Sequence, residues 1–187
     1  MRHDVICALG CVIALAPGPT RGGSTPPAAE EKEGESSAAL QDAVERAERA
    51  IRARACDVER RFGEGDPDAN ARECEGAAAV PGVEVGRTSA RLRNPENAPP
   101  GWARAYVAAT DGKKASQIAP TTFDLGDRVG VLRPIEIRQR CLRCHDAREK
   151  IPPSTLAWLA RAYPRDRSFG YALGDLRGFW WAEAPKR

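Results

Sequence analysis

Methionine and histidine are almost absent from this 187-residue chain, which contains one Met and two His. Met1 and His3 stand at the very start, so the chain beyond residue 16 has no methionine and only one histidine, His145. This scarcity excludes, from that part of the chain, any site built from two histidines or from a histidine and a methionine. Aromatic residues are also scarce before residue 100, where only Phe62 occurs. We therefore expect the densely packed part of the protein in the C-terminal half.

The chain also lacks a strong charge bias and a long hydrophobic run. Its 29 Lys and Arg against 26 Asp and Glu give a net charge of +3, which is too small to indicate nucleic-acid binding or a basic membrane-binding surface. The apolar run from Val5 to Ala16 is too short to span a bilayer comfortably, but it has the length of a signal-peptide core.

Residues 1–16 are therefore predicted to be a signal peptide or an uncleaved N-terminal anchor. Ala14-Leu15-Ala16 is similar to a signal-peptidase site, whereas Leu9-Gly10-Cys11 weakly resembles a lipoprotein signal. Each alternative predicts that the protein is exported to the periplasm or an equivalent compartment. The membrane would then be reached only through the leader or a lipid anchor.

The most specific motif in the chain is Cys141-Leu142-Arg143-Cys144-His145. This is the C-x-x-C-H pattern of c-type haem attachment. Two thiols at this spacing can each add to one vinyl group of a haem, and the imidazole of His145 can then ligate the iron. The motif predicts one covalently attached haem c held by Cys141, Cys144 and His145.

Two other chemistries use a cysteine pair at this spacing, a zinc site and a redox dithiol. His145 directly follows Cys144, which is a poor position for a tetrahedral zinc ligand. A dithiol site needs a long helix starting at the first cysteine, but Pro152-Pro153 closes this run within about two turns. Haem attachment is favoured over both, because the chain also carries an export signal.

The N-terminal part after the leader is predicted to contain a linker and a long helix. Residues 17–36 are rich in Pro, Gly, Ser and Glu without an apolar period, which predicts a disordered linker. From Ser37 to Phe62, apolar residues recur at spacings of three and four, and Gly63-Glu64-Gly65 ends this helix. Its opposite face, which includes Arg46, is expected to be solvated or, alternatively, to bind a partner.

A second helix is predicted from Asp66, the N-cap, to about Val80, with Pro67 at the first helical position. Cys74 shares a face with three alanines of this helix, so we expect it to point inward. Cys56, on the first helix, is expected to border the charged face.

Strands and short helices alternate in the rest of the chain. This order predicts an α+β domain over residues 37–187, with an antiparallel sheet. Strands are expected over Val83–Leu92, Thr121–Asp124 and Arg128–Ile137, helices over Trp102–Thr110 and Pro153–Ala162, and a closing hairpin over Gly170–Ala182 that turns at Gly174-Asp175.

Five short segments, taken in order, resemble the single-haem c-type proteins with a PAS-like α+β domain. The resemblance implies a PAS-like fold preceded by two N-terminal helices, in stand-alone exported proteins or in sensor domains of membrane receptors. It also places an inward cysteine ahead of the first segment, where Cys74 stands. The chain departs from the family at Phe169, where a smaller residue is expected. The segments are Gly86-Arg87-Thr88-Ser89, Leu92 to Pro99, Cys141 to His145, Tyr163-Pro164-Arg165-Asp166 and Gly174-Asp175-Leu176-Arg177-Gly178.

The second axial ligand of the iron is predicted to be Cys74. With Met and a second His missing, the remaining possibilities are Cys, Lys, Tyr, water or an open site. The inward helical phase of Cys74 and the family resemblance both favour it as a thiolate ligand, provided that its pKa is lowered. A disulfide between Cys56 and Cys74, or a simply buried Cys74, are the alternatives.

These features predict an exported, non-enzymatic, cytochrome-like protein that transfers electrons or senses a redox state or ligand, with a redox or signalling protein as partner. A peroxidase-like enzyme would need a distal acid–base group, usually His, which the chain lacks. A non-catalytic interaction module with a structural haem is the third alternative. Cationic donors for the haem propionates are expected among Arg91, Arg93, Arg128 and Arg177.

Overall fold

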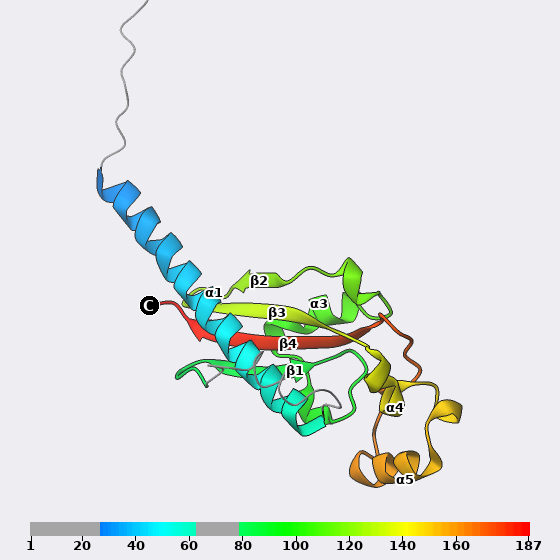
Figure 1. Cartoon of the computed structure of the whole chain (residues 1–187). Helices are drawn as coiled ribbons and strands as arrows, with labels where there is room; N and C mark the ends of the chain where they lie inside the picture. The colour runs from blue at the N-terminus through cyan, green and yellow to red at the C-terminus, as the bar shows by residue number, and fades with distance from the viewer. Residues whose placement is uncertain (1–26, 63–78) are drawn as a thin grey trace, which may run out of the picture.

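A four-stranded antiparallel sheet forms the centre of the protein in the computed structural model, which describes residues 27–62 and 79–187 (Figure 1). The order across the sheet is β1-β4-β3-β2. Together with the helices this gives the predicted α+β, PAS-like architecture. The strands are β1 (Glu84–Thr88), β2 (Thr121–Asp124), β3 (Arg128–Glu136) and β4 (Leu176–Pro185).

The hairpin of β2 and β3 forms as predicted. Gly126 adopts a positive φ of 88° at the turn, and the backbone N–H of Gly126 donates a hydrogen bond to the side chain of Asp124. Alternation along β3 then sends Val129 and Val131 to one face of the sheet and Leu132 to the other.

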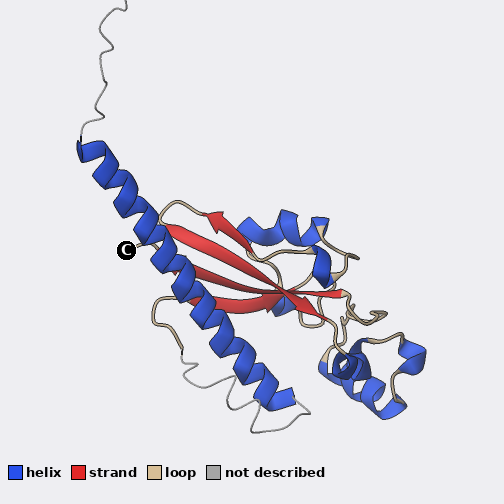
Figure 2. Ribbon diagram, turned by 45° about the horizontal axis from the view of Figure 1, so that its top comes forward, coloured by secondary structure: helices blue, strands red, loops and turns tan. Residues whose placement is uncertain are grey.

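Helix α1 (Pro27–Phe62) lies diagonally across one face of the sheet (Figures 1 and 2). Ala43, Ala47 and Ile51 of α1 pack on the small and β-branched side chains of β3 and β4. The other face is covered by the 3-10 turn Gly101–Ala103 and by α3 (Arg104–Ala109). The core on that side comprises Ala103, Val107, Ala115, Ile118, Leu132, Leu176 and Phe179.

Two expectations about α1 need correction. The helix begins at Pro27, so residues 27–36 are helical although their composition predicted a linker. Pro27 is suited to a first helical position, and the Ala, Glu and Lys residues after it are good helix formers. Arg46 is buried rather than solvated, because its guanidinium pairs with Asp42 and donates to the carbonyl of Pro185.

The expected hairpin over residues 170–182 is wrong, because β4 is one uninterrupted strand in the middle of the sheet. The residues before it are held elsewhere: the N–H groups of Gly170 and Tyr171 donate to the carbonyls of Asp146 and His145. A turn from Ala172 to Asp175, closed by a hydrogen bond of 3.1 Å, then leads into the strand. The segment after residue 170 is therefore a connection from the candidate site to the sheet.

The residues after β3 form a small helical lobe at one end of the sheet (Figures 1 and 2). It contains the 3-10 turn Gln139–Cys141, α4 (Leu142–His145), the 3-10 turn Arg148–Lys150 and α5 (Pro153–Ala162). The predicted helix over residues 66–80 lies almost wholly outside the described residues, and so does Cys74. Within the described ranges, no helix is long and apolar enough to cross a bilayer.

Candidate functional site

The end of β3 delivers the chain directly into the C-x-x-C-H motif. Ile137 is fully buried, and its N–H donates to the carbonyl of Asp175 over 2.9 Å, which fixes the exit from the sheet. The motif then folds as a 3-10 turn followed by the single turn of α4. Residues three apart in a helical turn lie on the same face. Cys141 and Cys144 therefore face the same side, and both are free and half-buried.

The imidazole of His145 is held by the segment that precedes β4. Its Nδ1 lies 2.8 Å from the carbonyl oxygen of Ser168 and 3.1 Å from the Ser168 hydroxyl. A carbonyl oxygen can only accept, so the hydrogen resides on Nδ1 and Nδ1–H donates to it. The lone pair of His145 is consequently on Nε2, the nitrogen that is available to a metal.

Burial and neighbouring cations keep the His145 ring neutral. Burial is the main cause that lowers its pKa to about 3, and the guanidinium groups of Arg177 and Arg93 lower it further. The hydrogen bond to Ser168 acts in the opposite direction, but it is the weaker effect. The ring also packs edge-on against Tyr171, with ring centroids 5.9 Å apart. A neutral, oriented imidazole is the form that ligates a metal.

An ion pair between Arg93 and Asp166 lies directly beside the imidazole. Arg93 Nε donates to Asp166 Oδ2 over 2.8 Å, and the two side chains are only 14% and 4% exposed. Arg93 Nη2 also donates to the carbonyl of Cys144, while Asp166 Oδ1 accepts from the N–H of Ser168 over 2.7 Å. The pair thus connects the C-x-x-C-H turn to the segment that holds His145.

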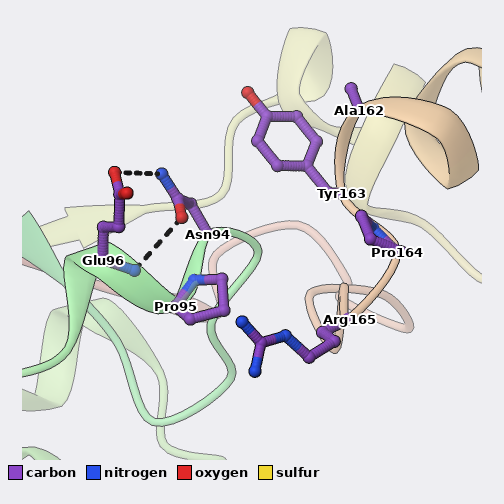
Figure 3. A pocket seen from close by; sticks show the side chains of 7 residues that line it. All are labelled: Asn94, Pro95, Glu96, Ala162, Tyr163, Pro164 and Arg165. Atoms are coloured by element: carbon purple, nitrogen blue, oxygen red, sulfur yellow. Dashed lines mark hydrogen bonds between the residues drawn. The ribbon is translucent and has the colours of Figure 1, made fainter.

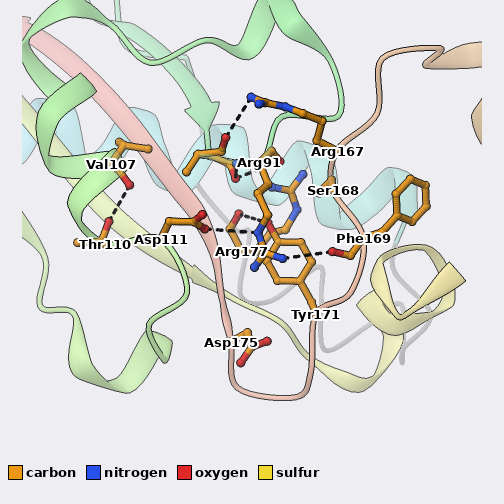
Figure 4. A network of polar contacts seen from close by, with 12 residues as sticks. Arg91, Val107, Thr110, Asp111, Arg167, Ser168, Phe169, Tyr171, Asp175 and Arg177 are labelled. Carbon is orange, nitrogen blue, oxygen red and sulfur yellow. Dashed lines mark hydrogen bonds and ion pairs between the residues drawn. The ribbon is translucent and has the colours of Figure 1, made fainter.

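Two further arginines surround Tyr171 (Figure 4). The guanidinium of Arg91 stacks over the Tyr171 ring at 3.8 Å from its centroid, and that of Arg177 lies 5.6 Å away. Arg91 also donates to the carbonyl of Phe169 and pairs with Asp111. Burial lowers the pKa of Arg177. No carboxylate of the described residues is in ion-pair contact with Arg177.

Three of the four arginines proposed for propionates therefore lie near His145, and Arg128 does not. Arg128 begins β3, whose other end leads to the motif roughly 25 Å away. There its guanidinium pairs with Glu183 and Glu84. Arg128 is a partner of acidic residues at the far end of the sheet, and its assignment to the site is wrong.

A recess of about 210 Å³ lies between the loop after β1 and the end of α5 (Figure 3). It is smaller than the pockets that usually enclose drug-sized ligands. Apart from Ala162, its walls come from two segments of the sequence resemblance, next in the chain to Arg93 and Asp166. The lining residues are Asn94, Pro95, Glu96, Ala162, Tyr163, Pro164 and Arg165.

Sequence reasoning identified the motif but did not assign roles to Asp166, Ser168 and Tyr171. These residues follow His145 by more than 20 positions, so no local pattern joins them to it. The one signal was the resemblance, because Asp166 ends its fourth segment.

Of the other cysteines, Cys56 is buried and disulfide-bonded, and its partner lies outside the described residues. Arg52, one helical turn earlier on α1, is exposed, so Cys56 lies at the border between the buried and the charged face of the helix. Among the described residues, no three His, Cys, Asp or Glu side chains gather as a metal-binding group.

The residues present fit the haem that the motif predicts. Two free thiols lie on one helical turn, and the adjacent imidazole carries its lone pair on Nε2. Arg177, Arg91 and Arg93 supply the positive charge that propionate groups require.

Comparison with known proteins agrees with the fold and the resemblance. A search of curated proteins gives no match. Among solved structures, the crystal structure of the cyanobacterial heme-protein Tll0287 matches with a TM-score of 0.50 and 21% identity, over 87% of this chain and 98% of that one. At this identity the likeness concerns the fold. The Tll0287-like family model matches residues 30–185, and the chain therefore belongs to the Tll0287-like family.

Proposed function

We propose that this protein is an exported, non-enzymatic, haem-binding protein with one covalently attached haem c, which transfers electrons or senses a redox state or ligand. The observation that carries the proposal is the arrangement at C-x-x-C-H: two free thiols and an imidazole whose Nδ1–H is engaged by the Ser168 carbonyl. Membership of the Tll0287-like family supports haem binding, since the solved structure of similar fold is of a heme-protein.

In this proposal each residue has a defined part. Cys141 and Cys144 form the thioether bonds, and Nε2 of His145 ligates the iron. Arg91, Arg93 and Arg177 balance the charge of the propionates. A haem bound in this way supplies one-electron redox chemistry, and the protein tunes it through ligands, hydrogen bonds and burial.

The test is haem staining after denaturing electrophoresis of protein exported together with a c-type maturation system. The wild type should retain one haem per chain, and the variant with Cys141→Ser and Cys144→Ser should retain none. Arg128→Gln is the matched control and should stain like the wild type. An unstained wild type would refute the proposal.

Cys74 is proposed as the sixth ligand, on the sequence grounds that the domain has no Met and no second His. The competing arrangement is a Cys56–Cys74 disulfide, and the disulfide bond of Cys56 weighs toward it. The two arrangements exclude each other. A thiolate on iron favours the ferric state and lowers the potential, whereas a disulfide leaves the sixth position open or bound by another group such as water, Lys or Tyr.

Absorption spectra separate these arrangements. If Cys74 ligates the iron, the ferric protein is low-spin, and Cys74→Ala produces a high-spin or water-bound form with a higher potential while Cys56→Ala changes nothing. If the disulfide forms instead, the wild type already takes up carbon monoxide when reduced, and Cys56→Ala alters the spectrum by releasing a thiol.

Export is proposed from residues 1–16. Fusing residues 1–36 to a reporter enzyme that is active only outside the cytoplasm should give active enzyme. A soluble, inactive cytoplasmic fusion would show that the leader does not export.

A further inference from the structure

Three segments that are far apart in the chain meet at the Arg93–Asp166 ion pair. Arg93 follows β1, Cys144 belongs to α4, and Asp166 lies after α5. Arg93 reaches the α4 carbonyl with Nη2 and the carboxylate with Nε, so a single side chain spans the two. A planar guanidinium can do this because its donors diverge in a fixed fork.

The carboxylate completes the connection to the imidazole. Asp166 Oδ2 is occupied by Arg93, and its Oδ1 accepts the N–H of Ser168, two residues further on. The carbonyl of the same Ser168 accepts Nδ1–H of His145 at 2.8 Å. Each link is within ordinary hydrogen-bond distance, so movement of Asp166 is transmitted to the acceptor that orients the ring.

The pair is also placed to influence charge at the ring. Arg93 Nη2 lies 3.3 Å from His145 Nδ1. Both groups carry hydrogens, so this contact places a cation beside the imidazole without a hydrogen bond. Because the side chains of Arg93 and Asp166 are nearly enclosed, solvent only weakly screens the effect of their charges on the imidazole.

We propose that Arg93 and Asp166 are a positioning pair for His145, which fixes the orientation of its imidazole through the Ser168 carbonyl and balances the charge beside the iron. This inference rests on the proposed function, since it concerns a haem ligated by His145. It also explains why the Leu92–Pro99 and Tyr163–Asp166 segments occur together: each supplies one half of the pair.

Neutralising Arg93 and neutralising Asp166 should shift the reduction potential in opposite directions. Arg93→Gln removes a cation near the iron and leaves the carboxylate, which favours the ferric form, so the potential falls. Asp166→Asn leaves the cation without its counter-charge, so the potential rises. A purely structural role would shift both variants in the same direction or not at all. The measurement is a spectroelectrochemical titration of the purified holoprotein.

The orientation of the His145 imidazole is tested separately, by NMR of the ferrous protein. The quantity measured is the rate of hydrogen exchange of Nδ1–H of His145. Exchange should be roughly tenfold faster in Arg93→Gln and Asp166→Asn, as expected when a hydrogen bond of ordinary net strength is lost. Arg93→Lys keeps the positive charge but loses the diverging guanidinium donors. The reduction potential of this variant should therefore stay near that of the wild type, while the exchange of Nδ1–H accelerates.

The matched control is the Arg128–Glu183 pair, in which the carboxylate likewise accepts from an arginine and from a second donor, Trp102 Nε1. Arg128→Gln and Glu183→Gln should leave potential and exchange unchanged. If Arg93→Gln and Asp166→Asn do not accumulate, Arg93→Lys and Asp166→Glu must still show faster exchange. Exchange rates equal to those of the control variants overturn the positioning role, and potentials equal to theirs overturn the charge-balancing role. A wild type without haem would instead refute the proposed function.

Discussion

Gly178 shows how closely one residue can determine the approach of two strands. Its φ is 149°, in the region that L side chains rarely adopt, and a Cβ at this position would lie 2.1 Å from the carbonyl oxygen of Thr88 and 2.8 Å from Cβ of Ser89. β1 and β4 can therefore pair up to Thr88 and Phe179 only because a glycine precedes Phe179. Arg177, next to it, is thereby held at the candidate site.

Gly178→Ala should lower the free energy of unfolding by roughly 2–4 kcal/mol, because it combines backbone strain with a clash against main-chain atoms. Denaturant titration followed by fluorescence measures this loss. Gly101→Ala is the control, since nothing lies within 4 Å of its added Cβ; it should change stability by no more than about 0.5 kcal/mol. Equal stabilities of the two variants would contradict the close approach.

The chemistry of the site was predictable at the scale of single residues only where it is local. C-x-x-C-H predicts Cys141, Cys144 and His145 as the haem site that we propose, because covalent attachment of a haem would require this fixed spacing along the chain. The groups that orient His145 obey no such spacing. Asp166 and Ser168 reach the imidazole through the tertiary fold, so their roles could be assigned only once the segments were seen together.

At the scale of elements, helix α1 depends on small side chains. Ala43 and Ala47 are completely buried against Val129, Val131 and the alanines of β4. Alanine at these positions lets the helix axis lie close to the sheet. It also explains why a chain rich in alanine forms a dense core without many large apolar residues.

Ala47→Leu should therefore destabilise the protein by about 1–3 kcal/mol, because the extra atoms have no space between α1 and the sheet. The same new side chain at Arg52, which is exposed on α1, should change stability by less than about 0.5 kcal/mol. Thermal unfolding followed by circular dichroism compares the two. If Arg52→Leu lowered stability as much as Ala47→Leu, the loss would not come from close packing between α1 and the sheet, and the prediction would be contradicted.

Local patterns predicted some elements correctly and failed on others for a physical reason. The β2–β3 hairpin and α5 were predicted because alternation, turn residues and a proline start lie within each segment. The hairpin over residues 170–182 was wrong because long-range hydrogen bonds bind Gly170 and Tyr171 to the C-x-x-C-H turn. The central place of β4, between β1 and β3, likewise depends on pairing that no local sequence pattern encodes.

At the scale of the whole molecule, charge is distributed unevenly although the net charge is only +3. Residues 138–167, which include the motif and α5, contain eight Lys and Arg against three Asp and Glu. This segment, which contains the helical lobe, therefore has an excess of five positive charges, and the rest of the chain is slightly acidic. Arg161 and Arg165 are exposed in this segment, and so is Trp158 of α5, at 49%.

This asymmetry predicts how the proposed haem exchanges electrons with small reagents. An anionic oxidant such as ferricyanide should react faster than a cationic oxidant of similar driving force, because the lobe around the motif attracts anions. Raising the ionic strength from about 0.01 M to about 0.15 M shortens the Debye length from about 30 Å to about 8 Å. The reaction with the anion should then slow, and the reaction with the cation should accelerate. Stopped-flow oxidation of the ferrous protein measures both.

Location is separated from net charge by two variants with the same change in charge. Arg161→Glu reverses a charge on α5, whereas Arg187→Glu reverses one at the C-terminus, at the opposite end of the sheet (Figure 1). The α5 variant should slow the reaction with ferricyanide at low ionic strength by roughly threefold, and the C-terminal variant should slow it far less, since the field of a single charge decays over a Debye length. Equal slowing in both would show that only net charge matters. Electrons would then not enter preferentially through the helical lobe.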